Sequence, residues 1–154
     1  MIQAKWCESD GELQDAFAIR EAVFVSEQGF PSESEWDELD AVCDHVIVYD
    51  GALPVAAGRL YELTGGAWGF GRVCVLKAHR KQRYGDLVVR MLLNRGLKKG
   101  AALFRISAQL HAQGFYEQFG FQAVGEPFRD ERVDAVMMEA AAEDVLFPRD
   151  CDGR

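Results

Sequence analysis

A tight turn at residues 50–51, Asp-Gly, separates two runs of β-forming residues over 42–49 and 54–63. An Asp-Gly pair between such runs is a strong signal for a β-hairpin, because both positions tolerate the positive φ that a two-residue turn requires. A second turn at residues 64–66, Thr-Gly-Gly, leads into a third run over 67–76. The middle of the chain is therefore predicted to form three successive antiparallel strands.

The hydrophobic period changes after these strands. Between residues 84 and 99 the apolar side chains recur at intervals of three and four residues, and Gly100 follows as a stop signal. This pattern predicts an amphipathic helix. A buried strand is predicted over 103–108, so strand, helix and strand form a βαβ unit. The strands near Val73 and Ile106 are therefore expected to run parallel.

The remaining segments complete a mixed sheet. Ser9 and Glu12 form a capping box that starts a helix, and Gly29 and Pro31 end it. The acidic stretch up to Asp40 is predicted to be a loop with at most one helical turn. The other predicted elements are a strand over 2–7, a short helix over 111–119, strands over 121–124 and 133–139, and a helical turn after residue 140. We predict one α/β domain over 1–154, with an α+β type of mixed sheet.

Composition limits the class of partner. The chain has 17 Lys and Arg residues against 25 Asp and Glu residues and a net charge of −8, which argues against nucleic acid or an anionic membrane as a partner. The first eight residues lack the apolar run of a signal peptide, and no segment approaches the roughly 20 apolar residues of a membrane span. We therefore expect a cytoplasmic protein. The four cysteines are widely spaced, which predicts reduced thiols and no metal site.

A basic loop precedes the helix predicted over 84–99. Residues 80–85 read Arg-Lys-Gln-Arg-Tyr-Gly. Free backbone N–H groups and the positive end of the helix dipole bind phosphate at such a position, and clustered cations strengthen that binding. A solvated loop without a ligand is the alternative interpretation.

Tyr116 is a candidate proton donor. It lies between Phe115 and Phe119, which are one helical turn apart and are predicted to lie in the core. A phenol has a pKa of about 10 in water, so it stays protonated at neutral pH and can protonate a departing thiolate. A packed aromatic ring with a hydrogen-bonded hydroxyl is the alternative interpretation.

Two arginines lie in largely apolar elements. Arg20 and Arg59 require carboxylate partners if they are buried. The acidic stretch offers Glu35, Asp37 and Asp40. A structural network of ion pairs is therefore predicted, although the same carboxylates could also recognise a cationic substrate.

Taken together, these segments resemble the GNAT superfamily of acyl-CoA-dependent N-acyltransferases and, over nearly the whole chain, its ElaA-like branch. The matching motifs are Arg20-x-x-Val23-Phe24-Val25-x-Glu27-Gln28-Gly29-x-Pro31, Glu35-x-Asp37-x-x-Asp40-x-x-x-x-His45, Gly58-Arg59-Leu60, Gly71-Arg72-Val73-x-Val75, Gln109-x-His111-Ala112 and Phe115-Tyr116-x-x-x-Gly120-Phe121. The resemblance implies a mostly antiparallel sheet that the parallel βαβ unit splays apart. It also implies helices on both faces and coenzyme A in the opening.

The resemblance further implies the cofactor-binding residues. The backbone of Val73, Cys74 and Val75 would pair with the pantetheine arm of acetyl-CoA, and Tyr116 would act as general acid near its sulfur. The pyrophosphate would lie on Arg80, Lys81, Gln82, Arg83, Tyr84 and Gly85. The implied reaction is transfer of an acetyl group to a primary amine of a small molecule or peptide by direct attack, which needs no metal ion.

Direct attack requires a neutral amine. An alkylamine with a pKa of about 10.4 is mostly protonated at neutral pH, so a base must remove its proton. The candidates are Glu27, Glu35, Asp37, Asp40, His45 and His111, and we single out Glu27 and His111. Cys74 is expected to be a strand thiol and not a nucleophile, because no His–acid arrangement is evident around it.

Arg83 departs from the family pattern. It occupies the first glycine position of the pyrophosphate loop, where a Cβ obstructs close backbone approach or an unusual φ. We expect weakened but retained cofactor binding. Two other functions stay open: an acyltransferase like the acyl-homoserine-lactone synthases, and a non-catalytic module that binds coenzyme A weakly or a partner protein. A homodimer also stays open.

Overall fold

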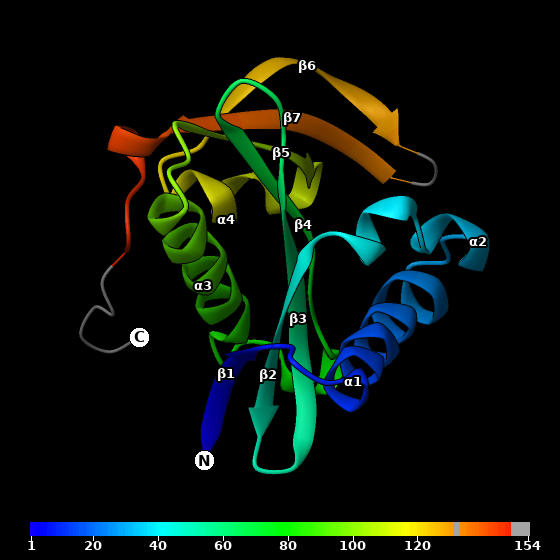
Figure 1. Ribbon diagram of the computed structural model, residues 1–154. Coiled ribbons are helices and arrows are strands. Elements are labelled where there is room, and N and C mark those ends of the chain that lie inside the picture. Colours follow the sequence, from blue (N-terminus) through cyan, green and yellow to red (C-terminus); the bar gives the residue numbers. More distant parts are fainter. Residues whose placement is uncertain (131–132, 149–154) are drawn as a thin grey trace.

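The sheet and its helices are described from a computed structural model of the chain, over residues 1–130 and 133–148. The strands are β1 (Ile2–Trp6), β2 (Asp44–Asp50), β3 (Leu53–Glu62), β4 (Ala67–Val75), β5 (Leu103–Gln109), β6 (Gln122–Asp130) and β7 (Val133–Ala141), and the α-helices are α1 (Asp10–Arg20), α2 (Ser32–Glu35), α3 (Tyr84–Lys98) and α4 (Gln113–Glu117). Within these ranges seven strands form one sheet in the order β1-β2-β3-β4-β5-β7-β6 (Figure 1).

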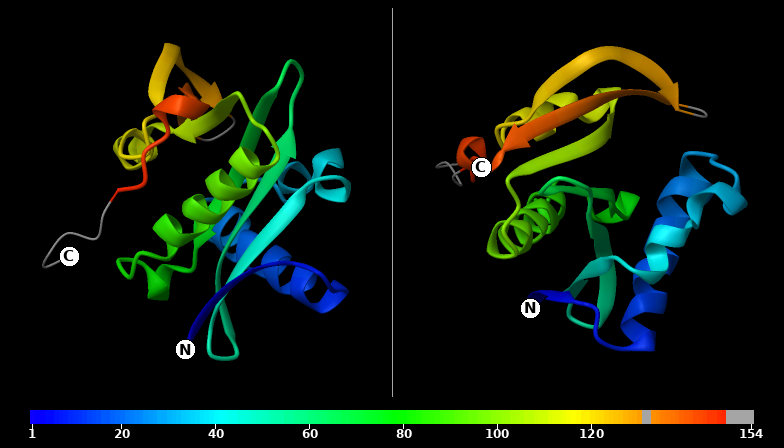
Figure 2. Two further views of the ribbon diagram at one scale, coloured as in Figure 1. Left: turned by 60° about the vertical axis from the view of Figure 1, so that its left-hand side comes forward. Right: turned by 45° about the horizontal axis from the view of Figure 1, so that its top comes forward.

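The strand pairing confirms the predicted antiparallel meander and the parallel relation of β4 to β5. Neighbouring strands in β1-β2-β3-β4 and in β5-β7-β6 are antiparallel, whereas β4 and β5 are parallel. That parallel pairing covers only Ala67 with Leu103 and Trp68 with Phe104. Beyond these residues the two halves of the sheet diverge, as the views in Figure 2 show. Val73 and Ile106 therefore lie on parallel strands but are not paired.

Helices cover both faces of the first half of the sheet, as the resemblance implied. Successive strand residues point to opposite faces, so Val46 of β2 lies in the core under α3 and Ile47 in the core under α1. Figure 1 shows these two helices on opposite faces of β2, β3 and β4. The fold class predicted from the sequence is therefore confirmed.

The acidic segment contains more helix than the sequence predicted. The helix predicted up to Gly29 comes first: after Arg20 it continues as a π-helix over Glu21–Glu27, and Gln28 N donates to Val23 O at 3.0 Å. One turn of helix, α2, follows, and then a 3₁₀-helix over Glu38–Ala41. The 3₁₀-helix is stabilised by Asp37, whose side chain accepts from the N–H of Leu39. The prediction of a loop over this stretch was therefore wrong for the 3₁₀ segment, because a capping Asp can also start a helix.

The strand β6 is longer than predicted. The sequence analysis predicted a strand over 121–124 only. In the structure the register between β6 and β7 shifts between Val124 and Phe128, so Gly125 and Pro127 lie in an irregularity within one strand that continues to Asp130. Gly and Pro are tolerated at such a bulge on an edge strand.

The structure bears on the expectations about membrane spans and about the cysteines. In the described ranges, no helix is long and apolar enough to cross a membrane. Cys7, Cys43 and Cys74 are free thiols, and Cys151 lies outside the described residues.

Close packing of α3 on β5 predicts that Gly96→Ala destabilises the protein. A Cβ at Gly96 would lie 2.5 Å from Cε1 of Phe104, a ring that is 0% exposed. The overpacking costs about 1–3 kcal/mol and should outweigh the gain of about 1 kcal/mol in helix propensity. Urea denaturation followed by circular dichroism would measure the difference.

Gly11→Ala is the matched control, because the nearest atom to a Cβ at Gly11, Ser9 Oγ, lies 4.0 Å away. This variant should be as stable as the wild type or more stable, by up to about 1 kcal/mol. Equal stability of Gly96→Ala and the wild type would contradict the packing described for α3.

Candidate active site

A cleft of about 630 Å³ opens where β4 and β5 diverge. One wall is formed by β3 and β4 with the residues from Val23 to Glu35, and the other by β5, β7 and α4. Among the residues predicted for the site, those that line the cleft are Val73, Cys74, Val75, Arg80, His111 and Tyr116. Those that do not line it are Glu27, Lys81, Gln82, Arg83, Tyr84 and Gly85.

A bulge in β4 shapes one wall of the cleft. Ala57 pairs with Cys74 and Arg59 with Gly71, so Arg72 and Val73 together face one residue of β3. Arg72 has a φ of 52°, which is unusual for a residue other than glycine. A bulge re-aims the side chains around it. Here Arg72 reaches the acidic segment, whose Glu35 carbonyl accepts from Arg72 Nη2 at 3.0 Å.

The edge of β4 next to the cleft can accept an extended ligand. Past Trp68, this edge pairs with no strand in the described part of the chain. Its backbone groups over residues 73–75 include the carbonyl of Val75, which accepts from Arg80 Nε at 3.0 Å. An amide-containing chain that runs between two strands can bind such an edge through backbone hydrogen bonds.

Tyr116 lies in an aromatic cluster at the cleft. Its ring centroid is 5.1 Å from that of Phe115 and 6.1 Å from that of Phe70. Its hydroxyl has no hydrogen-bond partner among the described residues, and burial raises the pKa of Tyr116, with a smaller contribution from Cys74. The phenol is therefore protonated at neutral pH and its proton is available to a ligand.

Cys74 is a neutral thiol. Burial raises the pKa of its thiol to about 12. A neutral thiol is a poor nucleophile.

The basic loop places its arginines against neighbouring carboxylates. Arg80 forms a two-pronged ion pair with Glu27, at 2.7 Å and 2.6 Å. The hydrogen bond from Arg80 is the main reason why the pKa of Glu27 is lowered, which weakens Glu27 as a base. Arg83 donates to Asp86 at 2.8 Å and has a φ of 69°, and Lys81 has a φ of 68°. Both φ values favour glycine, which explains the glycine of the family pattern at position 83.

His111 is the exposed candidate base at the cleft. It belongs to the 3₁₀-helix Leu110–Ala112 that follows β5 and borders the cleft together with Tyr116. The other imidazole among the candidates, His45, is buried, and its Nε2 lies 3.1 Å from the carbonyl of Asp40. Burial is the main reason that the pKa of His45 is lowered.

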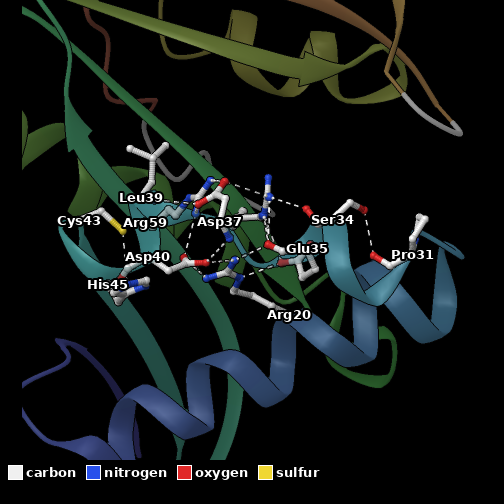
Figure 3. Close-up of polar contacts among 11 residues, drawn as sticks. Arg20, Pro31, Ser34, Glu35, Asp37, Leu39, Asp40, Cys43, His45 and Arg59 are labelled. Atoms are coloured by element: carbon white, nitrogen blue, oxygen red, sulfur yellow. Dashed lines mark hydrogen bonds and ion pairs between the residues drawn. The ribbon is translucent and has the colours of Figure 1, made fainter.

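The predicted ion-pair network is present (Figure 3). Arg20 and Arg59 are 1% and 3% exposed. Arg20 Nε contacts Glu35 Oε2 at 2.8 Å, and Asp40 Oδ1 accepts from Arg20 Nη1 at 2.7 Å and from Arg59 Nη1 at 2.8 Å. Both Nη atoms of Arg59 donate hydrogen bonds to the Asp37 carboxylate. These carboxylates are therefore occupied by guanidinium groups.

A small cluster with metal-ligand chemistry adjoins this network. One ligand atom each of Asp40, Cys43 and His45 lies within 4.8 Å of the others. Two guanidinium groups already neutralise the Asp40 carboxylate, so its environment disfavours a cation. We therefore interpret these three side chains as part of the ion-pair network and not as a metal site.

Several cleft residues were not singled out from the sequence. Gln109 of β5 donates to Gln28, the residue after the π-helix, at 2.9 Å and so links β5 to the helical segment on the opposite wall of the cleft. Tyr61 and Asp130 also line it. Gln28, Gln109 and Arg72 stood in matching motifs, but a motif alone does not indicate the partner of a side chain. Asp130 had no such signal, because it lies between the strands predicted over 121–124 and 133–139.

The lowered pKa of the Asp40 carboxyl predicts that the folded state loses stability at acidic pH. Burial alone would raise its pKa, but hydrogen bonds and charge from Arg20 and Arg59 hold it at about 2, below the value of about 3.9 in an unfolded chain. A lowered pKa stabilises the folded state above the unfolded pKa, and this stabilisation is lost as the pH falls from about 4 to 2. The free energy of unfolding of Asp40→Asn should therefore be below that of the wild type at pH 6, and the difference should shrink towards pH 2. Chemical denaturation at each pH would measure it, and a constant difference would contradict the assignment.

Comparisons with known proteins agree with this geometry. Residues 24–142 match the family model described as acetyltransferase (GNAT) domain. The uncharacterized N-acetyltransferase YjcF of Bacillus subtilis is 38% identical over 81% of this chain and 89% of its own. Among solved structures, ElaA of Escherichia coli has a TM-score of 0.82 at 26% identity, over 91% of this chain and 99% of its own. An acyl-CoA N-acyltransferase from Pseudomonas aeruginosa has a TM-score of 0.83 at 27% identity, over 92% of this chain and 100% of its own. The chain therefore belongs to the GNAT acetyltransferase family, and its resemblance to ElaA is confirmed.

Proposed function

We propose that this protein transfers an acetyl group from acetyl-CoA to a primary amine of a small molecule or peptide by direct attack. The observation that carries the proposal is the Tyr116 hydroxyl, which has no partner among the described residues and lies at the cleft between β4 and β5. A proton donor beside an open strand edge suits protonation of a thiolate that leaves a bound pantetheine arm.

The residues around the cleft fit coenzyme A. The edge of β4 over Val73, Cys74 and Val75 offers backbone groups to the amides of the pantetheine arm. The loop over residues 80–85 leads into the N-terminus of α3, which has 15 residues and favours an anion at this end. Arg80 adds a cation that lines the cleft. We assign Glu27 to positioning Arg80, because the ion pair between them lowers its strength as a base.

The chemistry requires two proton transfers. Bound acetyl-CoA supplies an activated acetyl group as a thioester. His111 accepts the proton of the attacking amine, directly or through a water molecule, and the amine nitrogen forms its bond to the carbonyl carbon. Tyr116 gives its proton to the sulfur as the carbon–sulfur bond breaks, so the products are an amide and coenzyme A.

Tyr116→Phe should lower kcat by about 100-fold or more, the usual contribution of a positioned general acid. The KM for acetyl-CoA should change little, because the ring contacts of Tyr116 are kept. Steady-state assays of coenzyme A release would measure both constants. A kcat within threefold of the wild type would show that Tyr116 is not the general acid.

The basic loop over residues 80–85 leads to a prediction about acetyl-CoA affinity. Arg80→Ala should weaken acetyl-CoA binding about tenfold in calorimetric titration, through loss of a charge-assisted contact. Arg83→Gly should strengthen it, because glycine adopts a φ of 69° without strain and has no Cβ. Arg105→Ala is the control, since Arg105 pairs with Glu139 outside the cleft and should leave the affinity unchanged.

Two results would redirect the assignment. Absence of acetyl-CoA binding by the wild type would favour a module that binds a partner protein. Turnover with S-adenosylmethionine and an acyl carrier protein, but not with simple amines, would favour chemistry like that of the acyl-homoserine-lactone synthases.

A further inference from the structure

Arg59 carries a buried hydrogen-bond donor without a partner. It lies on β3 and lines the cleft, and its side chain is 4% exposed. Nη1 donates to Asp37 and Asp40, and Nη2 donates to Asp37. Its Nε has no partner among the residues that the structure describes. Such an unsatisfied donor is costly to bury, but the atom itself is buried, so a ligand in the cleft cannot reach it.

Arg72 lies beside this donor. Its Nη2 is 3.5 Å from Asp37 Oδ2, the same oxygen that accepts from Arg59 Nη2 at 2.8 Å, so the two guanidinium groups flank one carboxylate oxygen. Arg72 Nε and Nη2 both contact Glu35, whereas Nη1 has no partner within the described ranges. Arg72 also lines the cleft, and 27% of its side chain is exposed.

The network carboxylates of this wall are already paired, which leaves none of them free for a cationic ligand group. Each of the three network carboxylates, Glu35, Asp37 and Asp40, is already held by a guanidinium group. Arg72 is therefore the arginine of this wall with a donor, Nη1, that a ligand in the cleft can reach. A guanidinium N–H donates a charge-assisted hydrogen bond to a carboxylate oxygen.

We propose that the acceptor amine carries a carboxylate, as a free amino acid does, and that Arg72 binds this carboxylate. The inference rests on the acetyl transfer proposed above, since it places the acceptor on the β3–β4 wall of the cleft that Tyr116 also lines. The reaction stays the one already written: the amino nitrogen takes the acetyl group, and the carboxylate is only bound.

Matched acceptors test the proposal. Alanine, phenylalanine and glutamate would each be compared with the corresponding α-carboxamide in an assay of coenzyme A release. At least one amino acid should have a kcat/KM at least tenfold above that of its amide. Arg72→Gln should remove this preference through the KM of the amino acid, while the kcat/KM of the amide and the KM of acetyl-CoA stay unchanged. Arg105→Gln, a change outside the cleft, should keep the preference.

Two results would contradict the carboxylate site, and they would differ in what they say about acetyl transfer and about Arg72. Transfer to amides and amino acids at equal rates would overturn the carboxylate site and leave acetyl transfer intact. An equal loss for all acceptors in Arg72→Gln would show a merely structural role for Arg72 and would also overturn the proposal.

A binding measurement tests the carboxylate site even if the enzyme shows no activity with these acceptors. If no acceptor turns over, calorimetric titration of the coenzyme A-saturated protein with N-acetylphenylalanine and with its amide replaces the assay. Tighter binding of the acid that Arg72→Gln abolishes would support the carboxylate site even though acetyl transfer had failed. No binding of the acid would overturn it.

Discussion

The early divergence of β4 from β5 determines the rest of this structure. The two strands pair at Ala67 and Trp68 with Leu103 and Phe104, and then each continues with only its outer neighbour. A sheet normally satisfies its backbone groups across every inner edge. Here an inner edge stays unpaired past Trp68 in the described part of the chain, and the cleft takes its walls from both halves of the sheet. The same divergence brings Tyr116, which follows β5, close to the bulged part of β4.

The buried charge network fixes the acidic segment over one wall of this cleft. Arg20 comes from α1, Arg59 from β3 and Arg72 from β4, and all three contact the segment from residue 35 to residue 40. Buried ion pairs often contribute little net stability, but breaking one is costly. The network is therefore best understood as a device that holds a short helical segment in one place. Its cost is visible in Arg59, whose Nε finds no acceptor in the described part of the chain.

Much of this architecture could be predicted from periodicity. The meander, the helix α3 and the parallel relation of β4 to β5 follow from hydrophobic patterns and from the turns at residues 50–51 and 64–66. The partners of Arg20 and Arg59 could be predicted as well, because a buried guanidinium requires carboxylates and the acidic stretch offers Glu35, Asp37 and Asp40.

Other features depend on contacts that no local pattern contains. The π-helix adds one residue per turn without changing the apolar period clearly, so the sequence could not distinguish it from α1. The pairing of Glu27 with Arg80 joins residues 53 positions apart, and each had been assigned a separate role. The bulge at Arg72 and the continuation of β6 to Asp130 follow from strand register, which is settled only by the neighbouring strand.

Hydrogen–deuterium exchange with and without acetyl-CoA tests the central claim most directly. If the ligand lies in the cleft, exchange should slow in peptides that contain residues 73–75 and residues 81–85, while peptides from β1 stay unchanged. Protection that is absent from both segments, or confined to another face of the protein, would contradict a coenzyme A site between β4 and β5.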